Sequence, residues 1–247
     1  METLAVIPTL PAIPVPAPAP KPAPAAPRAM FDLVLRDPQR LDALLLEEGK
    51  LGAAMHKLLG LSLAGLAAHG LLLGFVQRTI LWSSLSPSTQ EFFGAHPMLT
   101  LPVAFIGAFL TALGVCLPSF YFFTQLSGLD ASFRLVTAQA VRVMARTAVL
   151  LLGVLPFYAA LSLSRAVSSI VSPDTVLAVG FGLPFFVGLF GIASLYGSFR
   201  ALLKVLPITH ERRGRFLLRM VLAWGAVYSA VAPVALYRCI EALGRTF

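Results

Sequence analysis

Uncharged stretches long enough to cross a lipid bilayer dominate this chain. The longest extends from residue 92 to residue 129, where 38 consecutive residues include no Asp, Glu, Lys or Arg. A helix needs about 20 apolar residues to cross a hydrocarbon core, and the helix satisfies its own backbone hydrogen bonds there. We therefore predict an all-α polytopic membrane protein. Its five transmembrane helices are expected at residues 58–76, 98–123, 147–164, 175–199 and 220–237.

The composition supports a membrane protein and disfavours a nucleic-acid-binding one. Hydrophobic residues make up 57% of the chain and charged residues only 12%, about half the share in soluble domains. The net charge of +8 comes from basic residues beside apolar stretches, where anionic lipid headgroups are the expected counter-charges. No zinc-finger, RNA-binding or basic-zipper pattern is present. We expect membrane lipids, and no nucleic acid, as partners.

Basic residues alternate between the two sides of the predicted spans. Of the 19 Lys and Arg residues, 15 lie in the segments 1–57, 124–146 and 200–219. The other 4 are Arg78, Arg165, Arg238 and Arg245. Loops rich in Lys and Arg stay on the cytoplasmic side of a membrane. The pattern predicts a cytoplasmic N-terminus and a C-terminus outside, as an odd number of spans requires.

Four arginines gather just before the last predicted span, in the stretch "HERRGRFLLRM": Arg212, Arg213, Arg215 and Arg219. The simplest interpretation is a cytoplasmic anchor on the anionic lipids of the inner leaflet. The alternative is specific recognition of a phosphate headgroup or of an acidic protein partner.

Two segments precede the first predicted span. Residues 1–29 alternate proline with alanine, which predicts a disordered cytoplasmic tail with polyproline II character and a possible role as a docking strip. Residues 30–57 are expected to form an amphipathic juxtamembrane helix, with Asp37 as N-cap and Pro38 in its first turn. Residues 58–247 then form the five-helix transmembrane domain.

His69 is the only strongly ionisable side chain near the middle of a predicted span. Such groups are candidates for a functional role, although a hydrogen bond to a neighbouring helix is the alternative. Two pairs of small residues have the spacing that lets helix backbones approach closely: Gly70 with Gly74, and Ala193 with Gly197. We predict helix–helix contacts there, within the bundle or between subunits. Four spans also contain a proline: Pro118, Pro156, Pro184 and Pro233.

No motif for catalysis or cofactor binding is present. The chain has no HExxH, GxSxG, phosphate-binding loop or dinucleotide fingerprint. Its two cysteines, Cys116 and Cys239, are too few for a cysteine-based metal site, and the predicted topology puts them at different depths. We expect a protein that is not an enzyme and that needs no cofactor or metal.

The layout resembles the Yip family of small polytopic membrane proteins. The resemblance lies in the proline-rich tail, the helix "FDLVLRDPQRL" before the first span, and five closely packed spans. The segment "VCLPSFYFFTQLSG" at residues 115–128 is similar to uncharacterised bacterial relatives, which implies a bacterial inner membrane; the DLYGP-type motif of eukaryotic members is absent. The resemblance implies a membrane scaffold or trafficking-type adaptor without catalysis.

Two classes of function follow from these expectations. The first is a non-enzymatic integral membrane scaffold or adaptor, or a structural subunit of a larger membrane complex, with protein partners or further copies of itself. The alternative is a transporter or channel component, since proline-interrupted helices can line a transport site.

Overall fold

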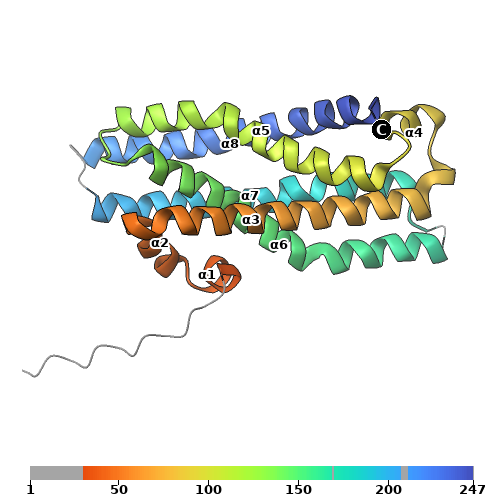
Figure 1. The fold of residues 1–247 in the computed structure, drawn as a ribbon, viewed down its shortest axis with the longest axis horizontal. Helices are drawn as coiled ribbons and strands as arrows, with labels where there is room; N and C mark the ends of the chain where they lie inside the picture. Colours follow the sequence, from red (N-terminus) through yellow and green to blue (C-terminus); the bar gives the residue numbers. More distant parts are fainter. Residues whose placement is uncertain (1–29, 169, 207–210, 247) are drawn as a thin grey trace, which may run out of the picture.

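The computed structural model describes residues 30–168, 170–206 and 211–246, without the side chains of residue 48 and residues 211–213. The predicted disordered tail, residues 1–29, lies outside the described residues. Within the described part, every regular element is a helix (Figure 1). The predicted all-α class is therefore confirmed for this part of the chain.

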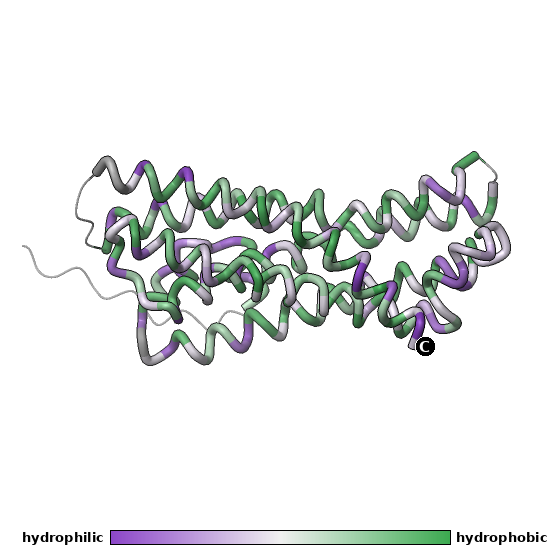
Figure 2. Tube along the Cα trace, turned by 90° about the horizontal axis from the view of Figure 1, so that it is seen from above, coloured by the Kyte–Doolittle hydropathy of each residue, from purple (hydrophilic) through white to green (hydrophobic). Residues whose placement is uncertain are grey.

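Five long helices form the body of the molecule: α3 (Glu48–Val76), α5 (Pro97–Leu126), α6 (Phe133–Val167), α7 (Pro173–Val205) and α8 (Glu211–Gly244). All five are long and apolar enough to cross a membrane, which confirms the predicted number of spans. Hydrophobic residues dominate the length of the bundle, and many of the hydrophilic ones gather toward its two ends (Figure 2). The protein is an integral membrane protein.

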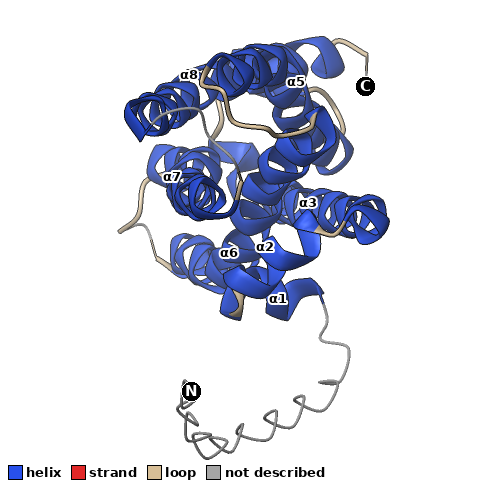
Figure 3. Ribbon diagram, turned by 90° about the vertical axis from the view of Figure 1, so that its left-hand side faces the viewer, coloured by secondary structure: helices blue, strands red, loops and turns tan. Residues whose placement is uncertain are grey.

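The five helices pack as a closed ring whose order differs from the chain order. Around the ring, α3 packs on α5, α5 on α8, α8 on α7, α7 on α6, and α6 on α3 (Figure 3). The apolar side chains that face inward form one continuous core. Since lipid tails are as apolar as leucine, close packing and hydrogen bonds must hold such helices together.

The two ends of the bundle carry different short helices. At one end, which we call the α2 end, α1 (Met30–Arg36) and α2 (Pro38–Leu46) lie beside α3 and α6 (Figure 1). At the other, the α4 end, α3 continues through a π-helical turn (Gln77–Leu81) and a 3-10 turn (Trp82–Ser84) into α4 (Pro87–Phe93). The C-terminal end of α8 lies at the α4 end.

The predicted juxtamembrane helix at residues 30–57 is wrong as a single element. Asp37 does cap α2 as predicted, because its carboxylate accepts a hydrogen bond from the Arg40 amide at 3.1 Å. The following Pro38 disfavours a helical conformation at Asp37, which separates α1 from α2. A second break falls at Glu47, whose backbone is extended, so the segment after it already belongs to α3.

The predicted loop at residues 124–146 is also wrong. The helix α6 begins at Phe133, so the connection between α5 and α6 is only residues 127–132. Charges such as Arg134 and Arg142 lie on α6 itself, because a helix can extend past the hydrocarbon when its polar side chains find water or a partner. The predicted loop at 200–219 is shortened in the same way, since α7 ends at Val205 and α8 begins at Glu211.

Candidate functional site

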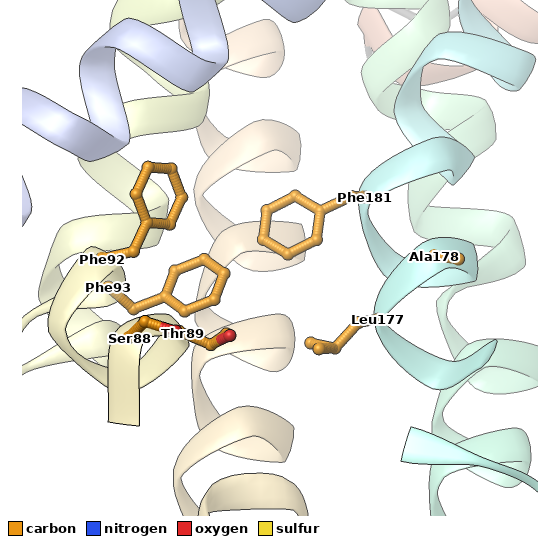
Figure 4. Close-up of a pocket in the computed structure, with 7 residues that line it drawn as sticks. All are labelled: Ser88, Thr89, Phe92, Phe93, Leu177, Ala178 and Phe181. Atoms are coloured by element: carbon orange, nitrogen blue, oxygen red, sulfur yellow. The ribbon is translucent and has the colours of Figure 1, made fainter. Parts of the chain in front are cut away.

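A hollow lies at the α4 end of the bundle, first between α4 and α7 and then between α4, α7 and α8. Its first part, of about 300 Å³, has the rings of Phe92, Phe93 and Phe181 in its wall, with Leu177 and Ala178 (Figure 4). A second part of about 280 Å³ shares these three rings and continues along Phe185, Leu236, Tyr237 and Ile240 of α7 and α8. The two parts adjoin at the rings of Phe92, Phe93 and Phe181, and together we call them the aromatic groove.

Stacked rings shape the aromatic groove. Phe93 of α4 stacks with Phe181 of α7, with ring centroids 5.6 Å apart and planes 14° apart. Phe92 stacks on Tyr237 of α8 at 5.2 Å. Figure 4 shows the rings of α4 on one side of the gap and that of Phe181 on the other. Such pairs add to the contact energy of burial, so they hold three helices around the hollow.

Two glycines fix α4 against the end of α8. Gly94 ends α4 with a φ of 72°, a conformation that other residues rarely adopt. A Cβ atom at Gly94 would also lie only 2.8 Å from the carbonyl oxygen of Gly244. This close approach holds α4 on α8, while the ring of Phe93 packs on α7.

A group of charged side chains borders the aromatic groove, and we call it the rim: Glu91, Arg238, Glu241 and Arg245. A hollow of about 220 Å³ between Glu91, Glu241 and Arg245 shares Phe92 and Tyr237 with the groove. The Glu241 carboxylate accepts hydrogen bonds from Arg238 at 2.9 Å and from Arg245 at 2.7 Å. Glu91 is exposed and makes no ion pair with the described residues. With two Glu and two Arg, the rim has no net charge.

His69 is buried in the bundle, where its side chain makes a hydrogen bond with a backbone carbonyl of another helix. Pro184 has no N–H, so the carbonyl of Gly180 four residues earlier has no helical partner. The Nε2–H of His69 donates to this carbonyl at 2.9 Å. A carbonyl only accepts, so the proton is on Nε2, and Nδ1 has no partner in the described part. Of the two alternatives for His69, the structure shows the hydrogen bond to a neighbouring helix.

A buried ion pair joins α2 to α6. Arg142 of α6 is only 3% exposed, and its guanidinium binds the carboxylate of Asp42. A second nitrogen of Arg142 donates to the carbonyl of Pro38 at 3.3 Å, and the Gln139 amide lies 3.5 Å from the same carboxylate. Leu41 and Leu45 beside Asp42 are fully buried. The pair therefore fixes α2 on the bundle.

The predicted arginine cluster lies at the α2 end, along the first turns of α8. Arg215 and Arg219 are exposed, as an anchor on lipid headgroups requires. The side chains of Arg212 and Arg213 lie outside the described residues.

The two pairs of small residues have different surroundings. A Cβ at Gly70 or Gly74 would lie 2.6 Å from backbone atoms of Pro102 or Pro97, so α3 and α5 approach there. Ala193 and Gly197 are instead exposed on α7, and a Cβ at Gly197 would meet no atom within 4 Å. For this second pair the predicted contact within the bundle is wrong, because this side of α7 faces away from its neighbours. A contact between subunits stays a prediction.

The sequence alone did not indicate the aromatic groove or the ion pair. The short helix α4 is signalled locally by its Ser86 cap and by Pro87, but it falls in a segment expected to be a loop. Asp42 lies next to the buried Leu41 in an amphipathic segment, and nothing in the local pattern indicates a buried partner for its carboxylate. An isolated Arg among apolar residues in "QAVRVMA" was the available signal for Arg142.

The described residues contain no group of three or more His, Cys, Asp or Glu that could hold a metal ion. Both cysteines are free thiols. Comparison of the chain with protein-family models, with curated proteins and with solved structures gives no match.

Proposed function

We propose that the protein is a non-catalytic integral membrane adaptor, or a structural subunit of a larger membrane complex. In this role the five-helix bundle holds an N-terminal module, α1 and α2 with the tail before them, at the membrane surface. The observation that carries the proposal is the buried pair of Asp42 and Arg142. A charged contact of this kind selects one arrangement of two elements, so the tail would leave the bundle from a fixed place.

The charge pattern supports a cytoplasmic position for this module, and the resemblance to uncharacterised bacterial relatives favours a bacterial inner membrane. Fifteen of the 19 basic residues belong to the tail and to the loops expected on the same side. Exposed Arg215 and Arg219 at the α2 end would contact anionic lipids there. The resemblance to the Yip family, which rests on the tail and the helix after it, favours the same role.

A charge-reversal series tests the adaptor proposal. The protein is purified in mild detergent, and the co-purifying proteins are quantified at matched expression. We expect a stoichiometric partner that is lost on deletion of residues 1–29 and weakened by Asp42→Arg. The combined change Asp42→Arg with Arg142→Asp is expected to restore it. Deletion of residues 1–29 is expected to leave a monodisperse protein. If the amount of co-purifying partner is the same in all of these variants, the proposed role of the module is contradicted.

Cysteine labelling in intact cells tests the proposed orientation. Single cysteines are placed at Ser86, at the α4 end, and at Asp130, at the α2 end, after Cys116 and Cys239 are replaced by alanine. Both sites are exposed. An impermeant maleimide is expected to label position 86 and not position 130, and cell lysis is expected to make both reactive. The reverse pattern would overturn the orientation.

A transporter or channel component is the second candidate. It is favoured by the prolines inside α5, α6, α7 and α8, and by the change in direction that α6 shows along its length (Figure 1). Reconstitution of the purified protein in vesicles separates the two candidates. Solute flux without any stoichiometric partner would favour the transporter.

A further inference from the structure

We propose that the aromatic groove holds one acyl chain of a glycerophospholipid with an ethanolamine-type headgroup, and that the rim binds this headgroup. The proposal concerns the α4 end of the bundle, so it goes beyond the adaptor role of the α2 end. It also holds for either orientation in the membrane, since it depends only on the groove and its rim.

The shape of the groove fits a lipid chain. Its two parts, of about 300 Å³ and 280 Å³, together have the size of a typical small-ligand site. Ala178, Pro233 and Tyr237 are exposed on the bundle surface, so the groove opens sideways. In an integral membrane protein this opening faces lipid. The walls of both parts contain no charged side chain, and their hydroxyl groups come from Ser88 and Thr89 in the first part and from Tyr237 in the second. Most of the favourable contacts there are therefore with an apolar chain.

The groove differs from an ordinary lipid-facing surface because it adjoins a polar site. Phe92 borders both of its parts and also the hollow at the rim, and Tyr237 borders the second part and that hollow. The charged groups of the rim therefore lie directly beside the apolar groove. This is the polarity of an amphiphile, with a chain at one end and a headgroup at the other.

The charges of the rim select the headgroup. Arg245 lines the hollow at the rim and Arg238 lies beside it, and because the two share the one carboxylate of Glu241, positive charge is left for a phosphate. The carboxylate of Glu91, which makes no ion pair with the described residues, supplies a site for a primary ammonium. An ethanolamine headgroup carries both charges and N–H donors for the carboxylate. A choline headgroup has no N–H to donate, and an anionic glycerol headgroup offers Glu91 only neutral hydroxyl donors and no positive charge. The neutral rim thus matches a zwitterionic headgroup with an ammonium donor.

The test measures retained lipid by native mass spectrometry. The full chain is reconstituted in vesicles with equal mole fractions of dioleoyl ethanolamine, choline and glycerol phospholipids, and is then extracted in mild detergent. We expect one retained ethanolamine lipid per chain, favoured over the other two by about fivefold, the scale of one or two exposed ion pairs.

Two matched variants on α7 separate the groove from the general lipid surface. Ala178→Trp puts an indole ring into the first part of the groove, where it competes with the acyl chain for space, and is expected to lower lipid retention about tenfold. Ala193→Trp makes the same change at an exposed alanine of the same helix away from the groove, and is expected to retain lipid like the parent. Equal retention by the two variants would overturn the proposal, as would the absence of retained lipid in the parent.

A rim variant tests the headgroup without altering packing. Glu91 is exposed, so Glu91→Gln is expected to fold normally and to reduce the preference for ethanolamine over choline to about one, within the range of a single exposed ion pair. An unchanged preference would overturn the headgroup assignment. The proposal would also be overturned if the parent retained no lipid but could be cross-linked as a dimer, and if Ala178→Trp lowered the yield of that dimer. This result would show that a second copy of the chain occupies the groove.

Discussion

Helices are held together by different interactions at the α2 end of this bundle and in the half that contains the α4 end. At the α2 end, the ion pair of Asp42 and Arg142 joins an added helix to the bundle. Toward the α4 end, Gly70 has no side chain, so the backbones of α3 and α5 can approach closely. Pro184 has no N–H, so it leaves a backbone carbonyl of α7 free to accept a hydrogen bond from His69 of α3. Charge decides one contact and backbone geometry decides the others, so the two regions should respond differently to mutation.

The largest effect is expected at the ion pair. Asp42→Ala leaves the guanidinium of Arg142 buried without its carboxylate, which destabilises the docking of α2 by about 3 kcal/mol. Limited trypsin digestion is expected to cut after Arg40 of α2 about 100-fold faster, because cleavage follows the opened population. Asp130→Ala, at an exposed aspartate of the same end, is the control and should leave the rate unchanged. Equal acceleration in both variants would show that the pair does not dock α2.

Close packing of α3 on α5 should give the next largest effect. A methyl group at Gly70 would meet the backbone of Pro102, so Gly70→Ala is expected to lower the free energy of unfolding by about 2 kcal/mol. Gly182→Ala is the control, since a Cβ there meets nothing within 4 Å and alanine favours a helix. Thermal unfolding in detergent measures both. If Gly70→Ala is as stable as the control, the two helices are less closely packed than the structure shows.

A smaller and more specific effect is expected for His69. His69→Leu leaves the Gly180 carbonyl without a donor, so we expect a loss of about 1.5 kcal/mol. Pro184→Ala restores a backbone N–H for that carbonyl. In this background His69→Leu should therefore cost about 1 kcal/mol less, as a double-mutant cycle of unfolding free energies would measure. Additive effects of the two changes would refute the link between His69 and Pro184.

The smallest effect is expected where only charge matters. The triple change of Arg212, Arg213 and Arg215 to lysine keeps the positive charge. It is expected to change the free energy of unfolding by less than about 0.5 kcal/mol and to leave partner recovery unchanged. The same residues changed to glutamate should each weaken attachment to anionic vesicles by about 1 kcal/mol. If the lysine variant alone loses its partner, the cluster recognises a specific phosphate or acidic group. The buried Arg142 gives the contrast, since Arg142→Lys should cost about 1 kcal/mol through a lost hydrogen bond.

Much of this molecule follows from short-range patterns. The length of the apolar stretches predicted five spans, and the sequence "RDPQRL" predicted the cap of α2, because both depend on residues that are neighbours in the chain. The boundaries were less predictable. Arg134 and Arg142 were expected in a loop, yet they lie on α6, since charge alone does not end a helix that is stabilised by packing.

The partners of each helix were decided only by the tertiary structure. Arg142 meets Asp42 across 100 residues, His69 meets Gly180 across 111, and the short α4 meets the far end of α8. The sequence by itself determined that the chain crosses a membrane, that it is helical, and which residues are apolar. Helical periodicity identifies the face that a residue occupies, but not the helix that this face will meet. The ring order, the ion pair and the aromatic groove therefore arise only when distant segments pack together.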